Sequence, residues 1–124
     1  MDKLYYQETE NSPMILFDKD ANVFNVNGVS VMEDSRVFYQ PVFQWIEEYI
    51  EQPNPETVIN FKIEYCNTSS SKQLYELLMK FKRLLDRNHK LVVNWHYEVT
   101  DDDLRDLGRF LTNLTGINLQ LITN

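Results

Sequence analysis

Four consecutive hydroxyl residues form the least ordinary stretch of this sequence, Asn67-Thr68-Ser69-Ser70-Ser71-Lys72. The stretch lies between an expected strand and an expected helix, and a helix needs only one N-cap. One interpretation makes Ser69 or Ser70 the cap, with Gln73 as the reciprocal partner of Ser70, and leaves the other hydroxyls as turn residues. The other makes one hydroxyl a phosphoacceptor, because a phosphate at a helix start meets free N–H groups and the positive end of the helix dipole, with Lys72 close enough to screen it.

Nucleophilic catalysis is a second possible chemistry for the same hydroxyls, in a small hydrolase or transferase that uses a Ser or Thr of residues 68–71 with His96 as base. Against it, the chain has no Gly-x-Ser-x-Gly sequence and only 3 Gly with which to build an oxyanion or phosphate loop. Trp95 and Tyr97 flank His96 at the expected end of a strand, where open sheets present functional groups. They are candidates for contact with a partner, although packing in the core is the more common role of such aromatic residues.

Metal and cofactor sites find little support in the sequence. The three carboxylates of Asp101-Asp102-Asp103 suit the first turn of a helix, where they meet the positive end of its dipole and point in different directions. His89, His96 and Cys66 do not stand at zinc-ligand spacing, and the chain has no Walker A or Gly-x-Gly-x-x-Gly sequence. We therefore predict no metal and no cofactor.

Composition restricts the class of partner. The 124 residues are 43% hydrophobic and 13% aromatic, which predicts one packed domain over 1–124 and excludes a disordered chain. The formal net charge of −7 disfavours nucleic acid and anionic membrane as partners, so a protein partner is favoured. One cysteine, Cys66, and the lack of a basic and then apolar leader at the N-terminus predict a cytoplasmic protein.

The hydrophobic pattern predicts a mixed α/β fold in the order β-β-β-α-β-α-β-α-β, with an antiparallel N-terminal meander and about three helices packed on the sheet. The expected strands are 4–9, 14–17, 23–26, 57–66, 90–97 and 117–122; the expected helices are 35–52, 70–88 and one that Thr100 caps and Gly116 ends. Asn27-Gly28 is expected to end the third strand. Pro41 suits only a first helical turn, so the first helix is expected either to begin near Tyr39 or to follow a kinked turn.

The same pattern assigns side chains to the core. In the fourth strand the alternation places Ile59, Phe61, Ile63 and Tyr65 on the more buried side. Near-continuous apolar residues at Leu91-Val92-Val93 predict a fifth strand covered on both faces. The expected buried stripe of the second helix is Leu74, Leu77, Leu78, Phe81, Leu84 and Leu85, and that of the third is Leu104, Leu107, Leu111 and Leu114.

Four segments of the chain resemble the SiaC-type regulatory phosphoproteins of bacteria. They are Ser12-Pro13 before Ile15-x-Phe17-Asp18, the helix entry Phe38-Tyr39-Gln40-Pro41, the junction Tyr65-x-Asn67-Thr68-Ser69-Ser70-Ser71-Lys72, and Trp95-His96-Tyr97 followed by Asp101-Asp102-Asp103. The resemblance spans nearly the whole chain. It implies a fold similar to the STAS domains of anti-sigma-factor antagonists, whose phosphoacceptor also lies at a strand-to-helix junction.

The resemblance also implies a function without catalysis, in which phosphorylation controls partner binding in cyclic di-GMP signalling. A Ser/Thr kinase would modify the junction, a metal-dependent protein phosphatase would reverse this, and the unmodified form would activate a diguanylate cyclase or bind another output protein. Thr68 matches the family's acceptor, with Ser69 and Ser70 as alternates. The residues that we predict to contact partners are Asn67, Ser69, Ser70, Ser71, Lys72, Trp95 and Tyr97.

Overall fold

One mixed sheet and three helices make up the protein. The computed structural model describes residues 1–124. In chain order the elements are β1 (Leu4–Tyr6), β2 (Met14–Asp18), β3 (Val23–Ser30), α1 (Ser35–Glu51), β4 (Glu56–Cys66), α2 (Thr68–Asp86), β5 (Lys90–Tyr97), α3 (Asp102–Thr115) and β6 (Gln120–Thr123). This is the predicted order of strands and helices. None of the three helices has both the length and the apolarity that a membrane crossing requires.

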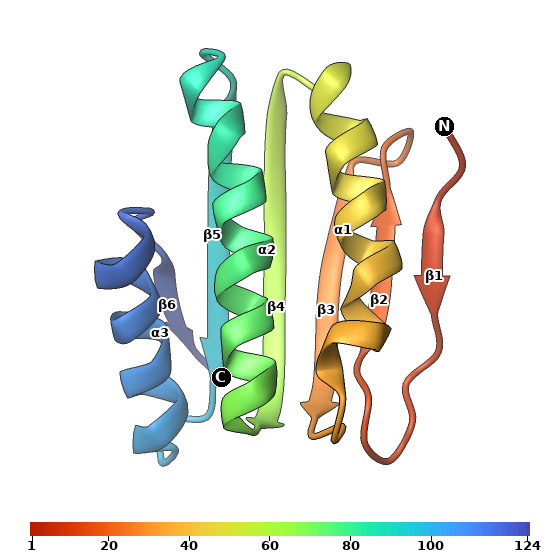
Figure 1. The fold of residues 1–124 in the computed structure, drawn as a ribbon. Coiled ribbons are helices and arrows are strands. Elements are labelled where there is room, and N and C mark those ends of the chain that lie inside the picture. The colour runs from red at the N-terminus through yellow and green to blue at the C-terminus, as the bar shows by residue number, and fades with distance from the viewer.

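The six strands lie in the sheet in the same order as in the chain, from β1 to β6. The first three pair antiparallel, and β3 to β6 pair parallel, which confirms the predicted meander followed by crossover helices. All three helices cover one side of the sheet, here called the helix face (Figure 1). The other side, the open face, carries no helix, so the prediction that β5 is covered on both faces is wrong: Val93 is buried, but Leu91 and Val92 are only half-buried.

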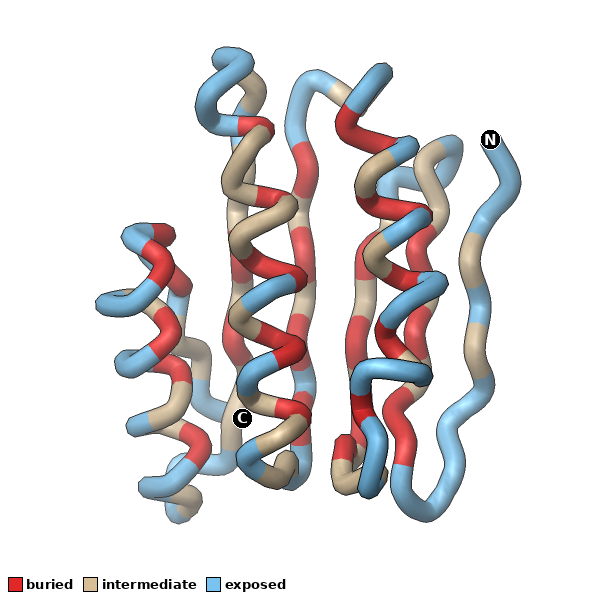
Figure 2. Tube along the Cα trace, in the orientation of Figure 1, coloured by how far each residue is buried: buried red, intermediate tan, exposed pale blue.

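The core lies between the helices and the helix face, and Figure 2 shows buried positions that recur along the helices and along the strands behind them. It contains 24 buried apolar residues, and a cluster of aromatic rings occupies the part beneath α1 and α2. Phe24 lies within 5.0 Å of Tyr49 and 6.2 Å of Phe81, measured between ring centroids. Phe17 contributes a further edge-to-face contact with Phe81 at 5.8 Å. Aromatic packing therefore joins the antiparallel strands to both α1 and α2.

A bulge in β4 corrects the predicted buried side of that strand. β3 continues through Gly28, which has a φ of 116° and does not end the strand as predicted. Gly28 pairs with Ile63, but the next residue, Val29, pairs with Tyr65, so Glu64 is an extra residue on β4. An extra residue reverses the alternation of side chains. Tyr65 is consequently 62% exposed, whereas Cys66 packs against the core.

The position of Pro41 within α1 also differs from the prediction. The helix begins at Ser35 and runs through Pro41 without a break, so it neither begins near Tyr39 nor follows a kinked turn. Pro41 has no N–H to donate to the carbonyl of Val37, one turn earlier, which weakens the helix locally. Burial of Tyr39, Val42 and Ile46 on the side facing the core compensates for that loss, because packing decides most helical stability.

The start of α3 and the side that it turns toward the sheet also differ from the prediction. Asp101, not Thr100, is the N-cap, and Gly116 ends the helix in the left-handed conformation as predicted. A Cβ on the buried Gly108 would lie only 2.7 Å from side-chain atoms of both Trp95 and Leu121. Because α3 approaches the sheet at this glycine, its buried side is Leu104, Gly108, Leu111 and Thr115, and Leu114 is 50% exposed.

The bounds of three further elements differ from the prediction. β1 ends at Tyr6, not at residue 9. β6 begins at Gln120, not at residue 117, because Ile117 and Leu119 turn into the core before the strand pairs with β5. Helix α2 starts two residues earlier and ends two residues earlier than predicted, and its residue Leu85 is exposed and not part of the core. The earlier start of α2 brings all four hydroxyl residues of the junction into its first turns.

Candidate functional site

Asn67 builds the junction between β4 and α2. Its side-chain oxygen accepts a hydrogen bond from the backbone N–H of Ser70 at 2.9 Å, so Asn67 is the N-cap, and the predictions of Ser69 or Ser70 in that role are wrong. The amide nitrogen of the same side chain donates to the carbonyl of Met32 at 3.2 Å. Its backbone N–H donates to the carbonyl of Ser30 at 3.1 Å. One residue thus caps the helix and fixes the junction to the loop that precedes α1.

Ser70 lies in the interior, beneath α1. Its side chain is fully buried, and the hydroxyl of Ser30 donates to its Oγ at 2.7 Å. The hydroxyl of Tyr39 in turn hydrogen-bonds Ser30 at 2.8 Å. Burial raises the pKa of Tyr39 to about 12, so the phenol is neutral and the chain of hydroxyls carries no charge. A kinase has no access to Ser70 in this structure.

Ser69 and Ser71 also hold intramolecular partners. The hydroxyl of Ser69 hydrogen-bonds that of Ser35, the first residue of α1. The hydroxyl of Ser71 donates to the carbonyl of Asn67 at 3.1 Å and lies 3.3 Å from the sulfur of Cys66. Burial raises the pKa of the Cys66 thiol, which favours the uncharged form beside this hydroxyl. Both serines are half-buried and tie α2 to its surroundings.

Thr68 is the exception among the four hydroxyl residues. It is the first residue of α2, its side chain is exposed, and its hydroxyl makes no hydrogen bond within the protein. Lys72 is exposed one helical turn later. A phosphate at Thr68 would therefore meet solvent, a first-turn helix dipole and an adjacent ammonium group, without displacing any existing contact.

Trp95 and Tyr97 occupy different environments. Trp95 is only 1% exposed and donates its indole N–H to the carbonyl of Leu104 at 2.9 Å, so it belongs to the core and offers no surface to a partner. Tyr97, at the end of β5, is half-buried and packs against the core. Trp95 is therefore not available for the partner contact predicted for it, because its side chain is buried between the sheet and α3. The contact predicted for Tyr97 stays a prediction.

His96 makes no hydrogen bond to the hydroxyls with which it would have to act in catalysis. Residues on β5 alternate, and because Trp95 faces the helices, His96 points to the open face. Its neighbour on that face, Asn94, donates to Asn60 of β4 at 3.0 Å. The hydroxyls of Ser69, Ser70 and Ser71 bond Ser35, Ser30 and Asn67, and no hydrogen bond joins any of residues 68–71 to His96. A hydrolase or transferase that pairs these hydroxyls with His96 finds no support in this geometry.

Asp101 and Asp102 have structural partners. The carboxylate of Asp101 accepts from the backbone N–H of Leu104 at 3.1 Å as the N-cap of α3. Asp102 pairs with Arg105 at 3.2 Å, one turn further along the same helix. Helix capping and a first-turn ion pair therefore account for Asp101 and Asp102, and Asp103 lies with Asp102 in the first turn of α3, where the sequence predicts the carboxylates.

An apolar groove between α2 and α3 begins beside Thr68. We call it the α2–α3 groove; it has a volume of about 250 Å³ and is lined by Thr68, Ser71, Lys72, Tyr75, Phe110, Leu111 and Leu114. Phe110 is 58% exposed, and Leu114, expected in the core, lies beside it. Phe110 is not among the residues that the sequence predicts to contact a partner, although its position outside the leucine stripe of α3 indicates an exposed aromatic residue.

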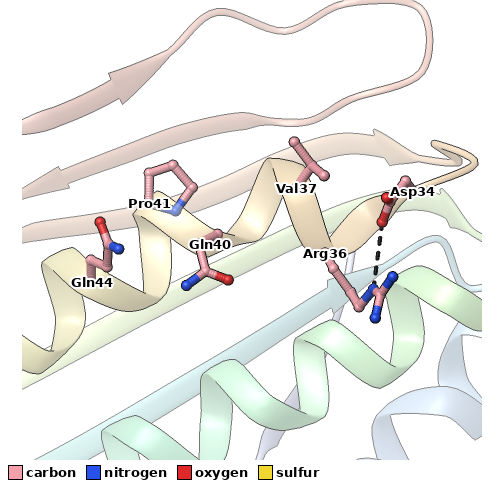
Figure 3. A pocket seen from close by; sticks show the side chains of 6 residues that line it. All are labelled: Asp34, Arg36, Val37, Gln40, Pro41 and Gln44. Carbon is pink, nitrogen blue, oxygen red and sulfur yellow. Dashed lines mark ion pairs between the residues drawn. The ribbon is translucent and has the colours of Figure 1, made fainter.

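A larger but shallower hollow of about 550 Å³ follows the outer side of α1. Figure 3 shows its lining side chains, with Arg36 reaching back toward Asp34 across an Nε to Oδ1 distance of 3.6 Å. The remaining lining residues are Val37, Gln40, Pro41 and Gln44. None of the residues predicted to accept phosphate or to contact a partner lies in this hollow, so it stands apart from the junction.

Fold and site together define a small α/β domain that presents a threonine hydroxyl at the start of a helix. The chain belongs to the SiaC family of regulatory phosphoproteins, whose family model matches residues 6–124. This confirms the family to which the sequence motifs point.

Similar proteins come from Pseudomonas aeruginosa. A protein of strain UCBPP-PA14 described as uncharacterized is 23% identical over 107 residues, which are 86% of this chain and 85% of that protein. The crystal structure of apo-SiaC superposes with a TM-score of 0.89 at 20% identity, over 99% of this chain and 100% of the other. A chain in the crystal structure of the diguanylate cyclase SiaD in complex with its activator SiaC gives the same TM-score and identity, over 98% and 99%. These structures confirm the mixed α/β fold.

Proposed function

We propose that this protein is a non-enzymatic switch whose unphosphorylated form binds and activates a diguanylate cyclase, and that Thr68 is its phosphoacceptor. Membership of a family of regulatory phosphoproteins supports the general role. The relative named SiaC is an activator in complex with the diguanylate cyclase SiaD, which supports the class of partner. A Ser/Thr kinase that adds the phosphate and a metal-dependent phosphatase that removes it complete the proposed cycle.

The observation that carries the assignment is the difference between Thr68 and the three serines that follow it. The hydroxyl groups of Ser69, Ser70 and Ser71 each hydrogen-bond another group within the protein, whereas that of Thr68 is exposed and has no such partner. A kinase must bring the acceptor oxygen to the γ-phosphate of ATP, so the free and exposed hydroxyl is the accessible substrate. The phosphate adds about −1.5 to −2 charge at a contact surface, which disfavours binding of an acidic or apolar partner surface.

Phosphorylation by the kinase from the same organism tests the assignment. Mass spectrometry is expected to place one phosphate on Thr68 of the wild type and none on Thr68→Ala, whereas Ser69→Ala remains a substrate. Treatment with a Mn²⁺-dependent protein phosphatase is expected to remove the group. Phosphate on Ser69 or Ser71 in the wild type would show that the acceptor is assigned to the wrong hydroxyl.

Cyclase activation tests the function itself. The purified diguanylate cyclase from the same organism is expected to make more cyclic di-GMP with wild type or Thr68→Ala than alone. Thr68→Asp and the phosphorylated wild type are expected to give little stimulation, because the added charge weakens binding. Equal stimulation by Thr68→Ala and by the phosphorylated protein would contradict a switch at this position.

A further inference from the structure

Exposed apolar side chains gather in the α2–α3 groove. Most large apolar residues that reach solvent are scattered over the molecule, at Met1, Tyr5, Val37, Tyr65, Leu85 and Val99. Phe110 and Leu114 instead stand one helical turn apart on α3, in the same groove as Thr68. Clustered apolar exposure beside a modification site is typical of a surface that binds another molecule.

The volume of the groove and the elements that form its walls indicate which kind of ligand it could bind. Its volume of about 250 Å³ is below the range of about 300–1,000 Å³ in which small-molecule sites fall. Side chains from two helices form its walls, and helix backbones already use their N–H and C=O groups internally. An added strand would find no backbone to pair with, so the apolar side of another helix is the complementary shape.

Charge in the groove defines one more property of the occupant. Lys72 is the one charged residue among the lining residues, and it has no ion-pair partner in the protein. An acidic side chain on the docked helix would complement it. A phosphate on Thr68, four residues earlier on the same helix, would pair with Lys72 and repel that acidic side chain.

We infer that the α2–α3 groove binds an amphipathic helix of the diguanylate cyclase, which inserts apolar side chains against Phe110 and Leu114 and sets an acidic side chain on Lys72. This inference rests on the proposed function. Phosphorylation of Thr68 releases the helix by removing the charge complement at Lys72 and by placing a strongly hydrated group in the wall of an apolar groove.

Binding measurements with purified cyclase test the site. Phe110→Asp and Leu114→Asp are expected to weaken binding by about 30-fold or more, the loss typical of a buried hot-spot residue. Val37→Asp is the matched control, because it makes the same kind of change at an exposed apolar residue on α1 outside the groove. This variant is expected to bind with the wild-type affinity. Thermal unfolding of each variant verifies that the fold is retained.

The contribution of Lys72 to cyclase binding is measured separately, through the dependence of affinity on salt. Lys72→Glu is expected to weaken binding by about 10-fold at low salt, and the wild-type affinity is expected to fall as salt rises. Lys72→Gln is expected to flatten that salt dependence. An unchanged salt dependence in Lys72→Gln would overturn the assignment of an acidic partner residue at Lys72.

The outcomes separate this inference from the proposed function. If the wild type binds and activates the cyclase but Phe110→Asp and Leu114→Asp do so equally well, the groove is the wrong site and the proposed function stands. If Phe110→Asp converts a dimer of this chain to a monomer without changing cyclase binding, the occupant is a second copy and the inference is overturned. If the wild type neither binds nor activates the cyclase, both statements fall.

Discussion

Helix α2 lies between helices α1 and α3, and it is more closely packed against α1 than against α3. Against α1, it places Lys80 and Arg83 on the carboxylate of Glu47, at 2.9 and 2.7 Å, above the aromatic core. Against α3, the ammonium group of Lys82 donates to the carbonyl of Thr115 at 2.6 Å near the far end of α2. Toward its start, the contact with α3 opens into the α2–α3 groove.

Three of the four hydroxyl residues at the start of α2 follow the same division. The fourth, Ser71, lines the groove but donates to the carbonyl of Asn67. Ser69 and Ser70 face α1 and hold hydrogen bonds to Ser35 and Ser30. Thr68 faces the groove and holds none. A charge added at Ser69 or Ser70 would disrupt their hydrogen bonds to Ser35 and Ser30, whereas a charge added at Thr68 would break no hydrogen bond within the protein. Of the four hydroxyl groups, that of Thr68 is the one that can take a charge without loss of a hydrogen bond within the protein.

The largest expected difference in the free energy of unfolding is between alanine substitutions at Phe81 and at Phe110. Phe81 is fully buried among aromatic rings, and Phe81→Ala is expected to lower the free energy of unfolding by about 3–5 kcal/mol. Phe110→Ala is expected to change it by about 0.5 kcal/mol or less, since its ring already meets solvent. Urea denaturation of both variants measures the difference. Equal losses would mean that Phe110 is part of the core and the groove is not open.

Alkaline pH tests the buried hydroxyl chain on the α1 side. Because burial raises the pKa of Tyr39 from 10.0 to about 12, the unfolded chain loses this proton before the folded protein does. Stability from this group is complete below pH 10 and is lost as the pH rises toward 12, by up to about 2.7 kcal/mol.

Tyr39→Phe removes that ionisation and is expected to flatten the decline. Chemical denaturation at pH 8 and pH 11 for wild type and variant gives the comparison. At pH 8 the variant is expected to lose about 1 kcal/mol from the missing hydrogen bond. A variant that declines as steeply as the wild type would show that Tyr39 is not the group responsible.

Gly108→Ala alters the position of α3 and hence the open side of α2. The added methyl group would meet Trp95 and Leu121 at 2.7 Å, which is too close for any real contact. We expect a loss of about 1–3 kcal/mol from this overpacking, despite the better helix propensity of alanine. Arg109→Ala, at the exposed neighbouring position, is the control and is expected to stay within about 0.5 kcal/mol in thermal unfolding.

The smallest expected effect comes from the ion pairs between α1 and α2. Lys80 and Arg83 lower the pKa of Glu47, so their stabilisation is present above its ordinary value and is lost as the pH falls through the lowered one. Because the pairs are partly exposed, Glu47→Gln is expected to cost only about 0.2–1 kcal/mol at pH 7 and less in high salt. Lys72→Gln, with no partner to lose, is expected to cost less still in the same urea titration.

Local pattern predicted the elements well because their causes are local. The spacing of Leu74, Leu77 and Phe81 predicts α2, and strand β5 spans residues 90–97 as expected. Assignment to the core was less successful wherever a residue remote in sequence changed an element's orientation. Tyr65 faces solvent because a bulge opposite Gly28 and Val29 reverses β4, and that pairing is not visible in β4 alone.

By itself the sequence determined the order of elements, the acidic charge, the family motifs and the run of hydroxyls between β4 and α2. Only the tertiary structure decided that Asn67 caps the helix, that Ser70 is buried and that Thr68 is free. Helical periodicity predicts which residues lie on the same side of a helix, but not which helix or strand that side contacts. Here the close approach of Gly108 to Trp95 fixes the rotation of α3, and that rotation leaves Phe110 and Leu114 exposed beside Thr68.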